Sequence, residues 1–205
     1  MKTYAGALVL AAALALPHAA RAEPAEPIVP PPVPAGLELS PQEFIPFLVA
    51  HAVGTQGYVC VANGAVYSWK PFGPDATLFN AEGEQILTHF LGITPYSLLL
   101  NPAWQHSRDS SIVWAAKIAE SADPNFVAPG AIPWLLLQAE VVGDGPTFGD
   151  KMIKTARIQR LNTWEGKAPA TGCAAPANIG QRALVPYEAD YYFYKRKAIL
   201  QPHED

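Results

Sequence analysis

The sequence lacks the long apolar runs and the excess of basic residues that mark two large classes of protein. Beyond its first 22 residues even the most apolar stretch, 131–142, is interrupted by Pro133 and Glu140, whereas a membrane-spanning helix needs about 20 apolar residues. Without Lys2 and Arg21 of the first segment, 12 basic residues stand against 18 acidic ones, a net charge of about −6. We therefore expect no membrane span and no nucleic acid as a partner, because nucleic acid binding needs clustered Lys and Arg.

Signatures of catalysis and of cofactor binding are missing as well. No Gly-x-Ser-x-Gly nucleophile motif occurs, and the His, Cys, Asp and Glu residues show none of the spacings typical of zinc sites. The sequence therefore predicts no cofactor, and an enzyme is the less favoured class.

The first 22 residues have the form of a cleavable secretory signal. Lys2 precedes an apolar run from Ala5 to Leu16, and the small-residue ending Ala20-Arg21-Ala22 follows. The apolar run is too short to act as a membrane anchor. We assign residues 1–22 to a signal peptide and expect a periplasmic or extracellular protein.

The rest of the chain divides into a spacer and one domain. Residues 23–36 are dominated by proline, a composition that favours an extended polyproline conformation, and we interpret them as a Pro-rich linker. Residues 37–200 suit a single β-rich domain that is long enough to bury a sizeable core.

The chain has only two cysteines, Cys60 and Cys173, and both follow the predicted signal. In an oxidising compartment such a pair is expected to be bridged. Neither has a basic or histidine neighbour in sequence that would favour a reactive thiolate. We predict a structural disulfide.

Hydrophobic patterning and turn residues predict strands rather than helices. The runs 58–62 and 65–69 flank Asn63-Gly64, a dipeptide typical of a hairpin with a type I′ turn. Further short strands, separated by Gly- and Pro-rich turns, are expected at 76–79, 85–90, 111–118, 134–142, 153–161 and 189–194. This pattern predicts an all-β, single-domain antiparallel sandwich or barrel-like fold with long loops.

Residues 41–53 allow two interpretations. Ser40-Pro41-Gln42-Glu43 has the form of a helix capping box with proline at the first helical position. Yet the alternation from Phe47 to Val53 has the period of a strand, and Pro46 would lie inside the helix. We favour a strand and keep the helix as the alternative.

Several segments are similar to the signature blocks of a known family. They are Gly54–Cys60, Thr88–Phe90, Ala103–Ser111, Ala131–Leu137, Ile158–Thr163 and Val185–Tyr194. Over about residues 45–195 the chain resembles the family called domain of unknown function 3455. The resemblance implies an exported bacterial or secreted fungal protein, and no established activity comes with it. Glu165-Gly166 and Asp109-Ser110-Ser111 depart from the family's usual Gly-Gly and Asp-Gly-Ser.

The densest group of polar and aromatic candidates is Trp104, His106, Arg108 and Asp109. We add His89, which lies in the expected strand 85–90. His89, His106 and Asp109 offer two imidazoles and a carboxylate, a set that binds metals in some enzymes. Asp109 equally suits capping its own turn through backbone N–H groups, and we favour that role.

A second group lies just before the loop that carries Cys173. Arg160 offers planar donors for a carboxylate or phosphate, and Asn162 offers a donor and an acceptor. Trp164 and Trp104 are flanked by turn residues, so we expect them to be exposed, where an indole can stack on a sugar ring. The polar side chains equally suit hydrogen bonding to the backbone of their own loop.

These observations favour a non-catalytic binding module for a small polar ligand, glycan or envelope component. Its ligand-binding residues would be His89, Trp104, Arg108, Asp109, Arg160, Asn162 and Trp164. The alternative from another class is a metal-assisted or hydrolytic enzyme that uses His89, His106 and Asp109. A purely structural envelope protein is a third interpretation.

Overall fold

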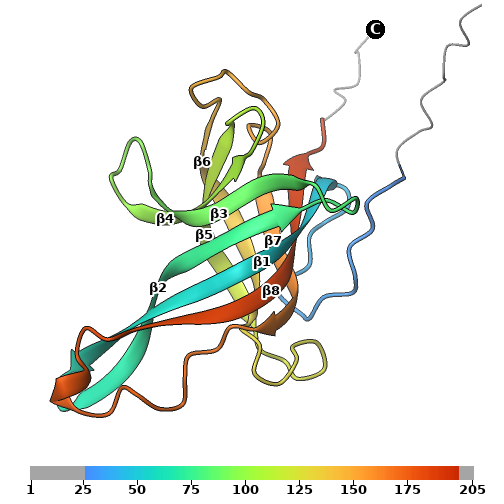
Figure 1. Ribbon diagram of the computed structural model, residues 1–205. Coiled ribbons are helices and arrows are strands. Elements are labelled where there is room, and N and C mark those ends of the chain that lie inside the picture. The colour runs from blue at the N-terminus through green and yellow to red at the C-terminus, as the bar shows by residue number, and fades with distance from the viewer. Residues whose placement is uncertain (1–25, 199–205) are drawn as a thin grey trace, which may run out of the picture.

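A computed structural model describes residues 26–198, so the predicted signal peptide lies outside the described residues (Figure 1). Eight antiparallel strands form a closed barrel in which each strand pairs with the next and the last pairs with the first. The strands are β1 (Phe44–Asn63), β2 (Val66–Phe79), β3 (Gln85–Ile93), β4 (Leu100–His106), β5 (Ile112–Ser121), β6 (Trp134–Gly143), β7 (Arg157–Glu165) and β8 (Arg182–Arg196). The predicted all-β, barrel-like fold is confirmed.

The helical content of the described residues is a single short 3-10 turn, η1 (Pro176–Asn178). None of the helices in the described part of the chain has the length and apolar character needed to span a membrane.

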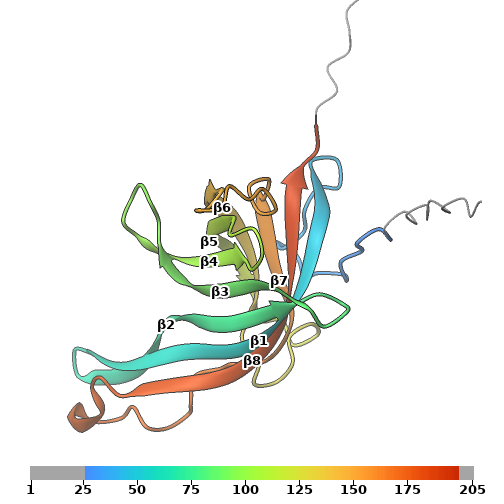
Figure 2. The same cartoon turned by 45° about the horizontal axis from the view of Figure 1, so that its top comes forward.

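Three strands are much longer than the sequence predicts. β1, β2 and β8 run on past the barrel as a three-stranded ribbon, which Figures 1 and 2 show projecting from the other strands. The ribbon leaves the barrel because β3 pairs only with Asp75–Phe79, the second part of β2. Gly54 allows β1 to lie against β2, since a Cβ at this position would come within 2.2 Å of the Asp75 carbonyl oxygen.

The predicted β1–β2 hairpin is confirmed, but its turn is placed one residue later. Asn63 pairs with Val66, so the two loop residues are Gly64 and Ala65 rather than Asn63 and Gly64. Gly64 has a φ of +62°, whereas Ala65 is not among the residues with positive φ. A positive φ at the first loop position alone is typical of a type II′ turn and not of the predicted type I′ turn.

The favoured strand at residues 41–53 is confirmed from Phe44 onward. Residues 41–43 form a turn in which the backbone N–H groups of Glu43 and Phe44 donate to the Ser40 carbonyl oxygen. Pro46 lies in β1 at an irregularity in the pairing with β8, a position at which a strand tolerates proline.

Two further strands, β7 and β4, depart from the sequence prediction. The strand expected from residue 153 begins only at Arg157, because residues 151–154 form bends that bring Met152 into the core. The strand β4 was not expected, since Asn101-Pro102 interrupts its apolar pattern.

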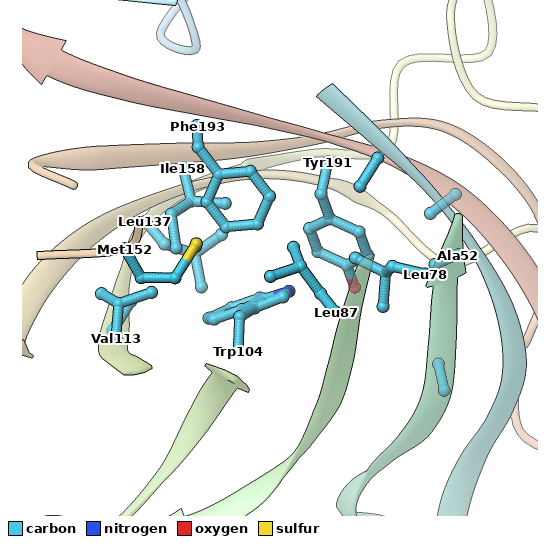
Figure 3. Packing of buried hydrophobic residues seen from close by; sticks show 14 of the residues in the cluster. Ala52, Leu78, Leu87, Trp104, Val113, Leu137, Met152, Ile158, Tyr191 and Phe193 are labelled. Atoms are coloured by element: carbon cyan, nitrogen blue, oxygen red, sulfur yellow. The ribbon is translucent and has the colours of Figure 1, made fainter. Parts of the chain in front are cut away.

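The barrel interior is filled by inward-facing side chains from all eight strands and the loop before β7. Figure 3 shows Trp104, Phe193, Tyr191 and Met152 in contact in this core. The aliphatic members that surround them include Leu78, Leu87, Val113, Leu137 and Ile158. At this point the barrel is a packed core rather than a channel.

A second apolar cluster covers part of the outer face of the barrel. Tyr192 and Tyr194 alternate with the inward Tyr191 and Phe193, yet both are buried. They lie under the segment that precedes β1, in which Leu37 is fully buried and Ile28 and Val33 are partly buried. The Gln159 side chain fixes this segment by donating to the Leu37 carbonyl oxygen at 2.6 Å. The described part of the Pro-rich segment therefore contacts the barrel wall.

The predicted disulfide joins Cys60 on β1 to Cys173 in the loop between β7 and β8. The same loop is held to the ribbon by backbone hydrogen bonds from Cys60 to Gln181 and from Gly180 to Cys60, each 2.9 Å long. The Trp69 indole N–H adds a bond of 3.0 Å to the Thr171 carbonyl oxygen. The disulfide and these hydrogen bonds therefore hold the loop against the part of the ribbon that is formed by Cys60 of β1 and Trp69 of β2.

Candidate functional site

A cavity of about 500 Å³ opens at one end of the barrel, where β2 separates from β3. Its lining combines many apolar side chains with four polar ones, and consists of Gln56, Pro71, Phe72, Gly73, Pro74, His89, Leu91, Leu100, Pro102, Trp104, Leu135, Leu137, Arg160 and Tyr191. The residues near the opening, such as Phe72 and Leu100, are partly or fully exposed, whereas His89, Trp104 and Tyr191 are buried and form the floor.

The floor is built from three aromatic rings on three strands. His89 on β3 is paired with Trp104 on β4, and both side chains point inward, so their rings stack with centroids 4.1 Å apart. Tyr191 of β8 contacts both rings edge-on, at 5.1 Å from His89 and 5.4 Å from Trp104. Stacked and edge-on contacts of this kind fix the rings in place and give the cavity a rigid base.

His89 is held as a neutral imidazole. Its Nδ1 atom lies 2.9 Å from the Ala103 carbonyl oxygen, and because a carbonyl only accepts, Nδ1 carries the proton. Burial lowers the pKa of His89 from 6.5 to about 3, and the positive charge of Arg160 acts in the same direction, while the hydrogen bond to Ala103 opposes them. At neutral pH this ring is therefore an uncharged part of the floor.

Arg160 provides the charge of the cavity. It comes from β7, where it pairs with Tyr191, and its half-buried side chain reaches Pro133, to whose carbonyl oxygen Nη2 donates at 2.8 Å. Its Nε atom is buried and has no hydrogen-bond partner in the part of the chain that the structure describes. The guanidinium thus brings donors and a permanent positive charge to the cavity lining.

Two further donors lie beside the floor. The indole Nε1 of Trp104 is buried and makes no hydrogen bond within residues 26–198, although the whole side chain is only 1% exposed. The Tyr191 hydroxyl lies 3.3 Å from the Tyr187 hydroxyl, and Figure 3 shows it at the same end of the cluster as the Trp104 nitrogen. Burial raises the pKa of Tyr191, so its hydroxyl stays protonated and able to donate.

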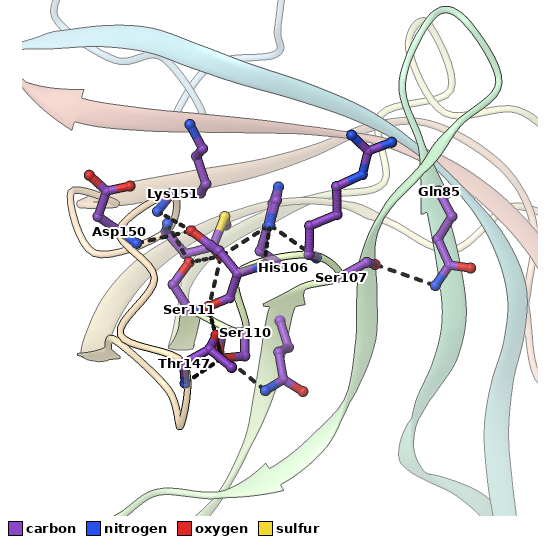
Figure 4. A network of polar contacts seen from close by, with 12 residues as sticks. Gln85, His106, Ser107, Ser110, Ser111, Thr147, Asp150 and Lys151 are labelled. Carbon is purple, nitrogen blue, oxygen red and sulfur yellow. Dashed lines mark hydrogen bonds and ion pairs between the residues drawn. The ribbon is translucent and has the colours of Figure 1, made fainter.

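Asp109 and Arg108, two predicted ligand-binding residues, do not line the cavity. Asp109 closes the turn after β4 and ties it to the 144–151 loop. Figure 4 shows the polar network in which Ser110 and Ser111 of this turn lie beside Thr147, Asp150 and Lys151 of that loop. One carboxylate oxygen accepts from the N–H and hydroxyl of Ser111, and the other accepts from the backbone N–H groups of Asp150 and Lys151 at 2.9 Å each. Arg108 is exposed and lies 3.4 Å from Glu84.

The charge of Asp109 is stabilised by this arrangement. Partial burial acts to raise its pKa, but hydrogen bonds from Ser111 and from the Lys151 backbone outweigh it and, with nearby His106, lower the pKa from 3.8 to about 2. The contacts have the geometry of the turn-capping role that the sequence favoured for this residue.

The suggested metal set is not assembled. His106 lies 3.0 Å from Asp109, but His89 lies in the barrel floor with its Nδ1 atom on a backbone carbonyl. Among the described residues no group of three or more His, Cys, Asp or Glu side chains is arranged to hold a metal ion.

Asn162 and Trp164 lie on the outer face of the barrel. Asn162 has a φ of +50° at a bulge of β7, and its amide donates to Asp190 at 2.8 Å. The other oxygen of Asp190 lies 3.0 Å from the His51 ring, so these side chains form a surface cluster. Trp164 is 58% exposed, as predicted, whereas the expectation of an exposed Trp104 is wrong because its indole faces the barrel interior.

Of the seven predicted ligand-binding residues, the structure therefore brings three together in the cavity: His89, Trp104 and Arg160. Sequence reasoning did not single out Gln56 or Tyr191. Tyr191 lies in the strand expected at 189–194, and only the inward parity that it shares with Phe193 connects it with Trp104.

Comparison with known proteins gives one match. The sequence model of a family described as "Protein of unknown function (DUF3455)" matches residues 41–195, which covers nearly the whole barrel. No curated protein matches the chain, and no solved structure does.

Proposed function

The chain belongs to the DUF3455 family of proteins of unknown function, and we propose that it is a non-catalytic binding module that takes a small, largely apolar organic molecule into the barrel cavity. The observation that carries this proposal is the composition of the cavity. A site of about 500 Å³ with mostly apolar walls and a few convergent polar groups has the properties of small-molecule sites in proteins.

The rigidity of the floor supports binding. His89, Trp104 and Tyr191 are held by ring contacts whether or not a ligand is present, so little order has to be gained when a molecule enters. The apolar walls, which include Phe72, Leu91 and Leu135, favour a hydrocarbon or aromatic body over a sugar in this cavity.

The chemistry of the lining favours binding over the enzymatic alternative. Its titratable members are His89, whose pKa lies near 3, and Tyr191, whose pKa is raised, so neither is tuned to exchange a proton near neutral pH. The carboxylate that the enzyme interpretation needs, Asp109, has its oxygens engaged by four donors of its own loops.

We place this binding function outside the cytoplasm. The leader-like residues 1–22 favour export, and the Cys60–Cys173 disulfide is compatible with an oxidising compartment. The ligand would accordingly be a molecule of the periplasm or the surroundings of the cell.

The experiment is a titration of the purified protein with N-phenyl-1-naphthylamine, a neutral apolar dye whose fluorescence rises when it leaves water. We expect a saturable increase with one dye per chain. Leu135→Trp places a larger ring on the half-buried cavity wall and should remove most of the saturable signal. The matched control is Leu184→Trp, at a position 63% exposed and outside the lining.

Circular dichroism and the melting temperature of both variants verify that they are folded. The proposal is wrong if the dye does not bind, or if a folded Leu135→Trp protein binds it as well as the control does.

A further inference from the structure

We infer that the ligand of the cavity is an apolar carboxylic acid, whose carboxylate is held by the Arg160 guanidinium while its hydrocarbon body lies along the apolar walls. This inference rests on the proposed binding function and names the chemical class of the ligand.

The first argument is the missing counter-charge of Arg160. It is the one Arg or Lys side chain in the lining, and no Asp or Glu lines the cavity with it. Among the described residues it takes part in no ion pair, although other charged side chains such as Arg108 and Lys117 do. A guanidinium that is drawn into an apolar cavity without a carboxylate is costly, and a bound anion offsets that cost.

The second argument is a set of buried donors without acceptors. The Arg160 Nε and the Trp104 Nε1 atoms are both buried and have no hydrogen-bond partner within the described chain. Both belong to residues that line the cavity. Tyr191 lines it too, and its hydroxyl, which lies 3.3 Å from the Tyr187 hydroxyl, is kept protonated by burial. Five buried side-chain atoms lack a partner within the described residues, and the Arg160 and Trp104 nitrogens belong to side chains that share one cavity, which favours an acceptor there. A carboxylate accepts several hydrogen bonds in one plane and matches the planar guanidinium.

The third argument is the apolar character of the rest of the lining. The donors come from β4, β7 and β8, whereas most other lining residues are apolar, including Pro71, Phe72 and Pro74 of β2 and Leu135 and Leu137 of β6. A molecule with one anionic end and a hydrocarbon body satisfies both kinds of lining. His89 adds no competing charge, since burial lowers its pKa to about 3 and leaves it neutral.

The test uses three ligands of equal chain length that differ in their head group: decanoate, decanol and decylamine. Each ligand is titrated at pH 7.5, below the ligand's micelle concentration, into the complex of the purified protein with N-phenyl-1-naphthylamine, and the displacement of the dye is measured. We expect decanoate to displace the dye at concentrations about tenfold or more below those of decanol, because one charge-assisted hydrogen bond changes an affinity by about tenfold or more. We expect decylamine to be the weakest competitor.

Arg160→Gln should abolish the preference for decanoate over decanol, each affinity being calculated with the dye affinity measured for the same variant. The matched control is Arg157→Gln on the same strand, since Arg157 lies over the Phe44 ring outside the cavity lining. Arg160→Lys retains the charge but loses the planar donors, so we expect an intermediate preference.

The outcomes separate the two proposals. If the dye binds but decanoate and decanol are equivalent, or if Arg160→Gln leaves their ratio unchanged, the carboxylic acid is wrong and the binding function stands. If the dye does not bind, the binding function itself is wrong.

Discussion

The buried His89 should make the stability of this protein depend on pH between about 3 and 6.5. The ring is 3% exposed, stacked on Trp104 and hydrogen-bonded to a backbone carbonyl, and its pKa is lowered from 6.5 to about 3. In the unfolded chain the same ring binds a proton below its ordinary pKa of about 6.5. Between these two values the unfolded state holds more protons than the folded state, so the free energy of unfolding falls as the pH falls.

The size of the effect follows from the two pKa values. Linkage between proton binding and folding gives a loss of about 2 kcal/mol from this one residue when the pH drops from 7 to 5. A loss of that size is a substantial fraction of the stability of an average domain. His89→Gln removes the titrating group, and its amide is long enough to donate to the Ala103 carbonyl oxygen in turn. We expect the variant to be less stable at pH 7, because it loses the ring stacking, yet nearly insensitive to this pH change.

The assay is urea unfolding, followed by tryptophan fluorescence at pH 7, 6 and 5 for the original protein and the variant. His51→Gln is the control, since its side chain is 49% exposed and pairs with carboxylates on the outer face. The control should keep the drop of about 2 kcal/mol that His89 causes. If His89→Gln loses as much stability between pH 7 and 5 as the original protein, the reasoning about the neutral buried ring is refuted.

Two further predictions concern the parts of the fold that hold the loops. Asp109→Asn leaves two donors of the network without an acceptor and should lower the free energy of unfolding at pH 7 by about 2–4 kcal/mol, while Asp150→Asn, an exposed carboxylate of the same loop, should change it little. Because the folded pKa of Asp109 is lowered to about 2, its contribution is present above the unfolded pKa of 3.8 and is lost as the pH falls through 2. The part of the difference that comes from the charge should therefore shrink to about a third in urea unfolding at pH 2.5, and an unchanged difference would contradict the role of the charge. Replacing Cys60 and Cys173 together by alanine opens a loop with a sequence separation of 113 residues and should lower the free energy of unfolding by about 3–5 kcal/mol, measured against the original protein with and without reductant. Equal stability of the oxidised and reduced original protein would show that the disulfide does not stabilise the fold.

The fold class could be predicted from local patterns, but the closure of the barrel could not. Alternation of apolar residues and the Asn63-Gly64 turn signal report on neighbours in sequence, and they identified the all-β class and the first hairpin. The pairing of β1 with β8 joins residues that are more than 100 positions apart, and the local sequence of either strand does not identify the strand with which it pairs. The length of both strands depends on that pairing, which explains why the expected strands were too short.

The candidate site was predicted in part for a similar reason. His89, Trp104 and Arg160 were chosen for their side-chain chemistry, and they meet because β3, β4 and β7 all turn these positions inward. Asp109 was chosen for the same kind of chemistry, but its carboxylate oxygens accept hydrogen bonds from the loops at 107–111 and 144–151. Residue type states what a side chain can do, whereas strand parity and closure decide which side chains meet.

The pairing of the first strand with the last also constrains the order in which this protein can fold. One edge of β1 pairs with β2, but the other edge can pair only when Arg182–Arg196 is present, and Cys60 can form its disulfide only with Cys173. A chain that emerges from its N-terminus, whether from the ribosome or through a membrane pore, must therefore keep the unpaired edge of β1 exposed until nearly the whole domain has followed. An exposed strand edge of this length invites pairing with other chains. Folding is consequently expected to be a late, all-or-none event, and a chain that is cut short before β8 should aggregate rather than form a smaller barrel.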